Sequence, residues 1–246
     1  MTYFKLGDDW KLGPDGIRER RSARVILMRH PAASSNRKTR DQAPSNGKLT
    51  DAAPSNSKQT DAAPSNSKNI AEPELLMVRG HDADNPSRSW WFTTGGGIAP
   101  GETPRQAAAR EVWEETGIKI SESELIGPVL TRTALFDFAT ETCRAEEVFF
   151  AAIVNPSQIP IGIQNGAQTH HGWTEVEFDL LDELAWLTPT QLVNQTKEVF
   201  PENLPQFARE LYGQLITTGW DGAVTHLGLQ DDDANYRAAQ GTSAGE

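Results

Sequence analysis

The stretch GGGIAPGETPRQAAAREVWEETGI, Gly95 to Ile118, decides the fold expected of this chain. Its second half predicts a helix from Pro104 to Thr116. Thr103 is a suitable N-cap, proline favours the first helical position, and Gln106 completes a capping box. Gly117 can adopt the left-handed conformation that ends a helix. The stretch therefore predicts a glycine-rich turn that leads into a well-bounded helix.

The predicted helix carries three glutamates close together. At about 100° per residue, Glu111, Glu114 and Glu115 fall within an arc of about 100°. Glu111 and Glu115 form a like-charge pair one turn apart, near the helix end where the dipole disfavours negative charge. Taken alone, EVWEE is typical of a solvated acidic face. A bound divalent cation is the alternative, because Mg²⁺ prefers oxygen ligands and shares them with substrate phosphates.

The residues around these glutamates fall at fixed intervals. The pattern resembles the signature of the Nudix hydrolase superfamily, G-x5-E-x7-R-E-U-x-E-E-x-G-U, where U is a bulky aliphatic residue. Every specified position matches, and a motif of this length and specificity rarely arises by chance. We call this motif, from Gly96 to Ile118, the box. Its matching residues are Gly96, Glu102, Arg110, Glu111, Val112, Glu114, Glu115, Gly117 and Ile118.

The resemblance implies an α+β fold, an α/β/α sandwich around a mixed β-sheet. We expect a single Nudix domain over residues 22–222, after an N-terminal extension, 1–21, and before a flexible C-terminal tail, 223–246. Apolar and β-branched runs supply the predicted strands. LPQFARELYGQLI, which begins at Leu204, predicts a helix with one apolar face.

A low-complexity repeat is expected to interrupt this domain. DQAPSNGKLT, DAAPSNSKQT and DAAPSNSKNI follow one another from Asp41, Asp51 and Asp61. A ten-residue unit with almost nothing apolar is too short to bury a core, and its Pro, Ser and Asn favour turns. We therefore expect a disordered insertion at 30–72, inside a hairpin of the strands ARVILM and ELLMVRG. A binding tract for a partner is the alternative.

Nudix enzymes hydrolyse a nucleoside diphosphate linked to another group, so the resemblance implies a metal-dependent pyrophosphohydrolase. It gives Arg110 the role of orienting a ligand glutamate. The ligands implied for Mg²⁺ or Mn²⁺ are Glu111, Glu114, Glu115 and the carbonyl of Gly96. The residues implied to shape the turn, the loop and the helix end are Gly96, Gly97, Glu102 and Gly117.

The general base has two possible sources in the family. It comes from the motif, where Glu114 is the candidate, or from a glutamate in another loop. Glu146 and Glu147, which open an apolar strand, are the candidates there. An aromatic ring before the glycines could stack on a base, although strand aromatics are more often part of a core. The candidate substrate-binding residues are Arg79, Trp91, Glu146 and His171.

The sequence leaves the substrate open among nucleotides, nucleotide-sugars and dinucleotides. The proline that follows the motif in the ADP-ribose type and the tyrosine of the diadenosine-polyphosphate type are both absent from TRTALF. The coenzyme A signature is absent as well. Two other classes remain: a nucleotide-binding sensor without catalysis, and an isomerase of a prenyl diphosphate, which would need Cys143.

Composition restricts the partners. The 246-residue chain has a net charge of −11. Residues 1–80 hold 14 Lys and Arg against 9 Asp and Glu, a balance of +5, and the remainder holds 9 against 25, a balance of −16. An acidic body makes nucleic acid an unfavoured partner, because affinity for its backbone comes from Lys and Arg. A single cysteine fits a cytoplasmic protein, no apolar run suits a membrane, and a homodimer is possible.

Overall fold

The structure is a computed structural model that describes residues 6–7, 9–31, 70–83, 85–138, 141–164, 173 and 179–243. Most of the insertion expected at 30–72 lies outside the described residues, and so does His171. Contacts separate the chain into one unit, residues 1–31 with 72–246, and a second unit, Ala32–Ala71. The first unit is described below. Within the described ranges, no helix combines the length and apolarity needed to cross a bilayer.

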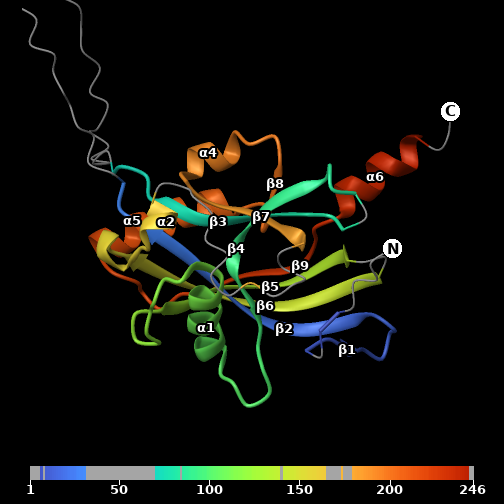
Figure 1. Ribbon diagram of the computed structural model, residues 1–246, viewed down its shortest axis with the longest axis horizontal. Coiled ribbons are helices and arrows are strands. Elements are labelled where there is room, and N and C mark those ends of the chain that lie inside the picture. The colour runs from blue at the N-terminus through green and yellow to red at the C-terminus, as the bar shows by residue number, and fades with distance from the viewer. Residues whose placement is uncertain are drawn as a thin grey trace, which may run out of the picture. The chain divides into compact units, whose positions relative to one another are not determined.

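The described strands form one mixed sheet of nine strands (Figure 1). Its order is β7-β3-β4-β2-β6-β5-β9, with β1 beside β2 and β8 beside β4. The pairs β2–β6, β5–β9 and β4–β8 are parallel. The strands are β1 (Lys11–Leu12), β2 (Arg18–Arg29), β3 (Glu74–His81), β4 (Ser89–Gly97), β5 (Ile126–Phe138), β6 (Glu141–Val154), β7 (Leu181–Leu187), β8 (Glu198–Val199) and β9 (Thr225–Asp231).

The sheet divides within β4. The second half of β4 pairs with β2, from Val25–Thr94 to Ser22–Gly97, whereas its first half pairs with β3. β2 and β3 share only two antiparallel residue pairs, at the end of β2, so the hairpin expected on either side of the insertion forms only over these two pairs. β2, β3 and β4 are mutually antiparallel, which no flat sheet allows. The β3–β4 part must therefore turn away from the β2–β6–β5 part.

Helices cover both faces of this sheet. α1 (Pro104–Thr116) has the predicted bounds and capping box, with Gly117 left-handed at φ 70°. Its Ala107, Ala108 and Val112 join one core cluster, and Leu204, Ala208 and Leu211 of α5 (Leu204–Thr217) join the other. The predicted α/β/α sandwich is confirmed. The shorter helices are the 3-10 turn η1 (Pro156–Gln158), α2 (Ile161–Gln164) and α4 (Pro189–Val193).

The two ends of the unit differ from the sequence prediction. β2 begins at Arg18, so the expected domain boundary at residue 22 falls inside a strand. In place of a flexible tail, β9 pairs with β5 and is followed by α6 (Ala234–Ser243), which lies near the ends of β5 and β6 (Figure 1). Most β9 side chains are exposed. This edge strand holds only two apolar residues, Leu227 and Leu229, and so gives little sequence signal.

Candidate active site

Arg110 is the centre of the acidic cluster on α1. It donates to both carboxylate oxygens of Glu102 at 2.9 Å, and to Glu111 and Glu114 at 2.8 Å each. It also donates to the carbonyl oxygen of Gly97 at 3.0 Å. The hydrogen bond to Glu102 raises the pKa of Arg110, and the same bond lowers the pKa of Glu102. Arg110 thus ties the helix to the loop before it.

The glycine turn packs directly against two carboxylates of α1. The backbone N–H of Gly95 donates to Glu115 at 3.0 Å. A Cβ on Gly96 would lie 2.7 Å from the carboxylate of Glu111. A Cβ on Gly95 would lie 2.4 Å from the carbonyl oxygen of Ala23. A side chain is therefore excluded at 95, and one at 96 would displace the carboxylate of Glu111. Both carboxylates are buried.

The cluster has the oxygen ligands that a hard cation prefers, but these ligands do not surround a common position. Among the described residues, no three Asp, Glu, His or Cys side chains are placed to hold a metal ion. The physical reason is Arg110, which engages an oxygen of Glu111 and an oxygen of Glu114. Glu114 is the most exposed of the three glutamates, with a side chain 37% exposed, and has room to turn.

A second charged network is buried beneath the box. Glu147 of β6 is paired with Arg24 of β2 and, at 2.6 Å, with Arg132 of β5. Arg132 also donates to both carboxylate oxygens of Asp232, at 2.8 and 3.0 Å. The Glu147 side chain is 1% exposed. Four charged groups from separate elements therefore form one continuous ion-pair chain.

The two carboxylates of this network titrate in opposite directions. Burial raises the pKa of Glu147, but the attraction of Arg24 and Arg132 outweighs it and lowers that pKa to about 2. Burial raises the pKa of Asp232 to about 6, because Arg132 is shared and Glu147 adds repulsion. A carboxylate with so low a pKa is a poor proton acceptor. Both oxygens of Glu147 are engaged by arginines, so its place in the fold is electrostatic, and its predicted role as the base finds no support in this geometry.

An aromatic cavity of about 110 Å³ lies next to this network. Arg24 connects it to the box, because its guanidinium donates to the carbonyl oxygens of Thr93 and Gly95 at 3.1 and 3.4 Å. Arg24 thus lines the cavity and also contacts Gly95, the residue whose N–H group bonds Glu115. Its lining residues are Arg24, Trp90, Phe92, Arg132, Phe136, Asp137, Phe138, Glu147, Phe200, Asp232 and Asp233.

Two polar cavities lie beside the box loop. One, of about 410 Å³, is lined by Glu102 and by the loop from Ile98 to Gly101. The other, of about 380 Å³, is lined by Thr131, His226 and the buried Arg132–Glu147 pair. Both are lined by Ile98 and by Glu146, whose side chain is exposed. Glu146 is therefore available to a ligand in a way that Glu147 is not.

The other predicted substrate contacts are not brought together. Arg79 is paired with Glu183 at 3.0 Å and with Asp182 at 3.7 Å. Trp91 is 4% exposed and packs in the core cluster that contains Leu204, so it offers no ring face to a ligand. Its neighbours on either side line the aromatic cavity instead. His171 lies outside the described residues, so the structure does not test it.

The functional residues that sequence reasoning missed are Arg24, Arg132 and Asp232. The first two had a readable signal, because each is an arginine inside an otherwise apolar or β-branched strand, ARVILM or PVLTRTALF. A cation in such a strand requires a buried partner. Asp232 had no comparable signal, because it belongs to a polar run, QDDDAN, in the segment expected to be a tail.

Cys143 does not have the character of a catalytic thiol. It is buried, and burial raises its pKa to about 11. The thiolate, which is the nucleophilic form, is therefore scarce at neutral pH. The isomerase alternative loses its support.

Comparison with known proteins agrees with the family that the box indicates. The profile of the NUDIX domain matches residues 65–211. Over 53 residues the chain is 45% identical to an RNA pyrophosphohydrolase of Cereibacter sphaeroides, which is 22% of this chain and 32% of that protein. Over 56 residues it is 51% identical to diphosphoinositol polyphosphate phosphohydrolase 2 of Rattus norvegicus, 23% of this chain and 29% of that protein. The chain thus spans about a third of the length of these curated relatives.

Solved structures with 13–14% identity resemble the chain at low TM-scores. A C. elegans Ap4A hydrolase complex has a TM-score of 0.39, covering 80% of this chain and 97% of that one. Shewanella oneidensis NrtR has a TM-score of 0.43, covering 79% and 64%. The assignment rests on the domain profile, which matches more than half of the sequence. The chain belongs to the Nudix family.

Proposed function

We propose that this chain is a metal-dependent hydrolase that cleaves a pyrophosphate linkage in a nucleoside diphosphate derivative. The observation that carries the proposal is the packing of two buried carboxylates, Glu111 and Glu115, against the glycine turn. Buried carboxylates are costly unless cations or hydrogen bonds compensate them. The donors at this turn are oxygens, which suit Mg²⁺ or Mn²⁺.

The residues that would hold the ions are Glu111, Glu114, Glu115 and the carbonyl of Gly96. A bound divalent ion neutralises phosphate charge and lowers the pKa of a coordinated water. The protein's own part is to fix the ligands. Arg110 and Glu102 brace the loop before α1, and the Gly95 N–H group orients Glu115. Glu114 would leave or share its bond to Arg110 in order to join the set.

The general base would be Glu114 or Glu146. Glu114 lies on the helix beside the buried pair, with an exposed side chain. Glu146 lies at the rim of the two polar cavities beside the box loop. Either carboxylate can take a proton from a water that attacks a phosphorus atom. Substitution of each by glutamine, with the pH dependence of kcat/KM, separates the two.

The aromatic cavity would bind the base of the nucleotide. Trp90, Phe92 and Phe200 supply ring faces, and base–aromatic stacking is worth about 1–3 kcal/mol per base. Arg24 bonds the carbonyl of Gly95, and the N–H of Gly95 bonds Glu115, so a base in the cavity and phosphates at Glu115 would lie on either side of one β-strand residue. A nucleotide rather than a bare polyphosphate is therefore the proposed substrate.

The test is a hydrolysis assay with Mg²⁺ or Mn²⁺ on nucleoside triphosphates, ADP-ribose, NADH and dinucleoside polyphosphates. We expect turnover of at least one compound, lost in Glu115→Gln and retained in Glu210→Gln. Glu210 is a matched glutamate on α5, where it accepts a bond from Gln206. Turnover that is absent, or equal in the two variants, would refute the proposal.

A second candidate function is a nucleotide sensor that binds without cleavage. One observation favours it: Arg110 already engages Glu111 and Glu114, so the described carboxylates do not converge on a metal. Binding of a nucleotide by calorimetry, with the same affinity in Glu115→Gln and with no turnover over the whole panel, would support this function over hydrolysis.

A further inference from the structure

The aromatic cavity has two walls that come from different parts of the sheet. β4 and β5 are not neighbours, because β2 and β6 lie between them. Strand pairing alone therefore does not fix the distance between these walls. We call them the β4 wall, made of Trp90, Phe92 and Phe200, and the β5 wall, made of Phe136, Asp137 and Phe138.

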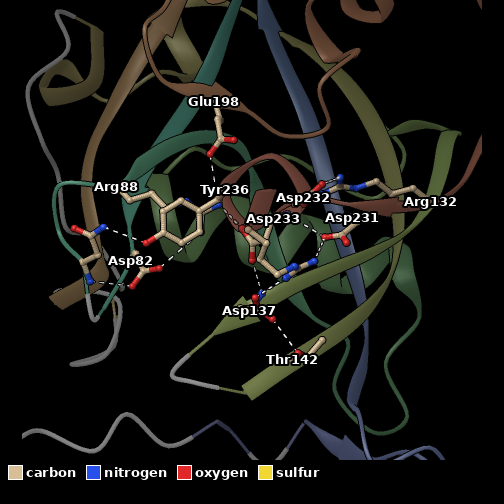
Figure 2. Close-up of polar contacts among 12 residues, drawn as sticks. Asp82, Arg88, Arg132, Asp137, Thr142, Glu198, Asp231, Asp232, Asp233 and Tyr236 are labelled. Carbon is tan, nitrogen blue, oxygen red and sulfur yellow. Dashed lines mark hydrogen bonds and ion pairs between the residues drawn. The ribbon is translucent and has the colours of Figure 1, made fainter. Parts of the chain in front are cut away.

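Asp233 connects the two walls (Figure 2). One of its carboxylate oxygens accepts a bond from Arg88, directly before β4, and the other accepts a bond from the backbone N–H of Asp137 in β5. The side chains of Asp233 and Arg88 are 4% and 8% exposed. Charge-assisted bonds in a buried setting are strong and hold a defined geometry. One side chain thus links the residue before the β4 wall to the backbone of the β5 wall.

The residues on either side of Asp233 hold the same segment in place. Asp232 takes both bonds from Arg132. The ring of Tyr236 covers the guanidinium of Arg88 at 4.1 Å, and Trp90 lies 5.2 Å from the same group. Figure 2 shows Tyr236 and Asp233 converging on Arg88 from α6 and from the turn before it. The segment therefore contacts a ring of the β4 wall through Arg88.

The charges of the cavity suit a ring rather than a phosphate. Its two arginines, Arg24 and Arg132, are already paired with carboxylates. The carboxylates in the lining outnumber them: Asp137, Glu147, Asp232 and Asp233. Such a site repels phosphate, whereas a ring can pack against its aromatic side chains.

We propose that the segment Asp231–Arg237 is part of the substrate site, and that Asp233 is a positioning residue that sets the separation of the two walls. Asp233 touches no reacting atom and acts through Arg88 and Asp137. The inference rests on the proposed function in one respect, that the ligand carries a base. It needs binding rather than turnover, so it can be tested separately.

The test compares ligands with and without a ring. Binding of ATP, GTP, CTP and UTP and of inorganic triphosphate is measured by calorimetry with Ca²⁺, for wild type, Asp233→Asn and Glu198→Gln. Glu198 is the matched control, because it also contacts Arg88, at 3.4 Å, but bridges no wall. We expect Asp233→Asn to weaken the best nucleotide by about tenfold and triphosphate by less than twofold. Glu198→Gln should resemble wild type.

Enzyme kinetics provide a measurement that a purely structural role of Asp233 would not change. For a hydrolysed nucleotide, Asp233→Asn should raise KM about tenfold and leave kcat within twofold, because the box is untouched. Equal losses for nucleotide and triphosphate, a fall in kcat alone, or no loss would overturn the inference. The inference would also be overturned if the wild-type protein bound no nucleotide more tightly than it binds inorganic triphosphate. Ring-dependent loss of binding without turnover on the panel would sink only the proposed hydrolysis.

A second variant covers the case in which Asp233→Asn does not fold. Tyr236→Ala removes the ring over Arg88 and leaves the Asp233 bridge intact. The hydroxyl of Tyr236 also accepts a bond from Asn85 at 3.3 Å. We expect it to weaken the nucleotide by about threefold and triphosphate not at all. A folded Tyr236→Ala protein with unchanged nucleotide affinity would overturn the inference.

Discussion

Arg110 and Glu102 meet through two hydrogen bonds of 2.9 Å each, across the loop that joins β4 to α1. The pair closes the loop, because Glu102 also accepts from the N–H of Ala99 at 3.0 Å. A guanidinium matches a carboxylate in this two-bonded way and an ammonium does not. The geometry therefore depends on arginine and not on positive charge alone.

Arg110→Lys should lower kcat by about tenfold, because Glu102, Glu111 and Glu114 lose their common anchor. Arg105→Lys is the matched control on the same helix, since Arg105 donates to carbonyl oxygens of Leu125 and Gly127. It should change thermal stability and leave kcat within twofold. Steady-state assays and melting curves of both variants check this. Equal losses of kcat in Arg110→Lys and Arg105→Lys would show that Arg110 has no specific role in holding the box.

Gly96→Ala should abolish metal-dependent activity. The new methyl group would lie 2.7 Å from all three carboxylate atoms of Glu111, which would have to leave the turn. Gly97→Ala is the neighbouring control, because its methyl group would meet only the side chain of Asp9, which can rotate. Titration with Mn²⁺ followed by calorimetry should show weaker uptake in Gly96→Ala alone. Normal Mn²⁺ uptake in that variant would contradict the role given to Glu111.

Glu147→Gln should destabilise the fold rather than slow the chemistry. It leaves Arg24 and Arg132 without their shared partner in a buried site, a change that typically costs about 3–5 kcal/mol. Glu146→Gln, one residue earlier and exposed, should not change the urea midpoint. Urea unfolding of both variants measures the difference. A Glu147→Gln protein as stable as wild type, with reduced kcat and a shifted acid limb of the pH profile, would restore it as the base.

The stability of the protein should depend on pH through Asp232. Its pKa is raised from 3.8 to about 6 in the folded protein, so the folded state keeps a proton that the unfolded chain releases. The free energy of unfolding therefore falls as pH rises from about 4 to 6, by up to about 3 kcal/mol. Glu147 has the opposite effect on stability, and it acts at lower pH, because its pKa falls from 4.5 to about 2 in the folded protein. Its contribution is complete above 4.5 and is lost as pH falls toward 2.

Urea unfolding at pH 4.5 and 6.5 isolates the Asp232 contribution. Wild type should lose more stability between these pH values than Asp232→Asn, because asparagine does not titrate. Parallel pH dependence in wild type and Asp232→Asn would show that Asp232 is ionised normally.

The sequence predicted the box well because its determinants are local. Thr103, Gln106 and Gly117 cap the helix through contacts within a few residues. The charged network could not be predicted, because Arg24, Glu147 and Asp232 come together only when β2, β6 and the C-terminal segment are assembled. Sheet order and register decide such contacts, and neither has a local sequence signal.

The C-terminal segment is a second case in which local sequence does not reveal contacts with distant residues. QDDDAN has the composition of a solvated tail, and nothing in it marks a strand or a helix start. Its structure depends on partners far away in the sequence, such as Arg88 and Asp137, which take up the charge of Asp233. Composition therefore identified a polar segment correctly but gave the wrong prediction of its order.

The ends of β2 and β3 allow a direct test of the insertion. Arg29 lies opposite Glu74 and pairs with it at 2.7 Å, so these two residues need only a short connection. Deletion of residues 32–71 leaves His30, Pro31, Glu72 and Pro73 between them. Glu72 is retained because its carboxylate accepts bonds from Thr190 and Arg209.

We expect the deletion protein to fold and to keep kcat and KM within twofold of wild type, since no described residue of the box or the cavity is removed. A roughly tenfold shorter loop lowers the entropy of the unfolded chain and should raise the free energy of unfolding by about 2 kcal/mol. Urea unfolding and the nucleotide assay measure both quantities, and a version with four added Gly-Ser residues controls for strain in the short turn. If both versions melt well below wild type, the residues from 32 to 71 contribute to the fold. A loss of activity at unchanged stability would instead place them in the substrate site.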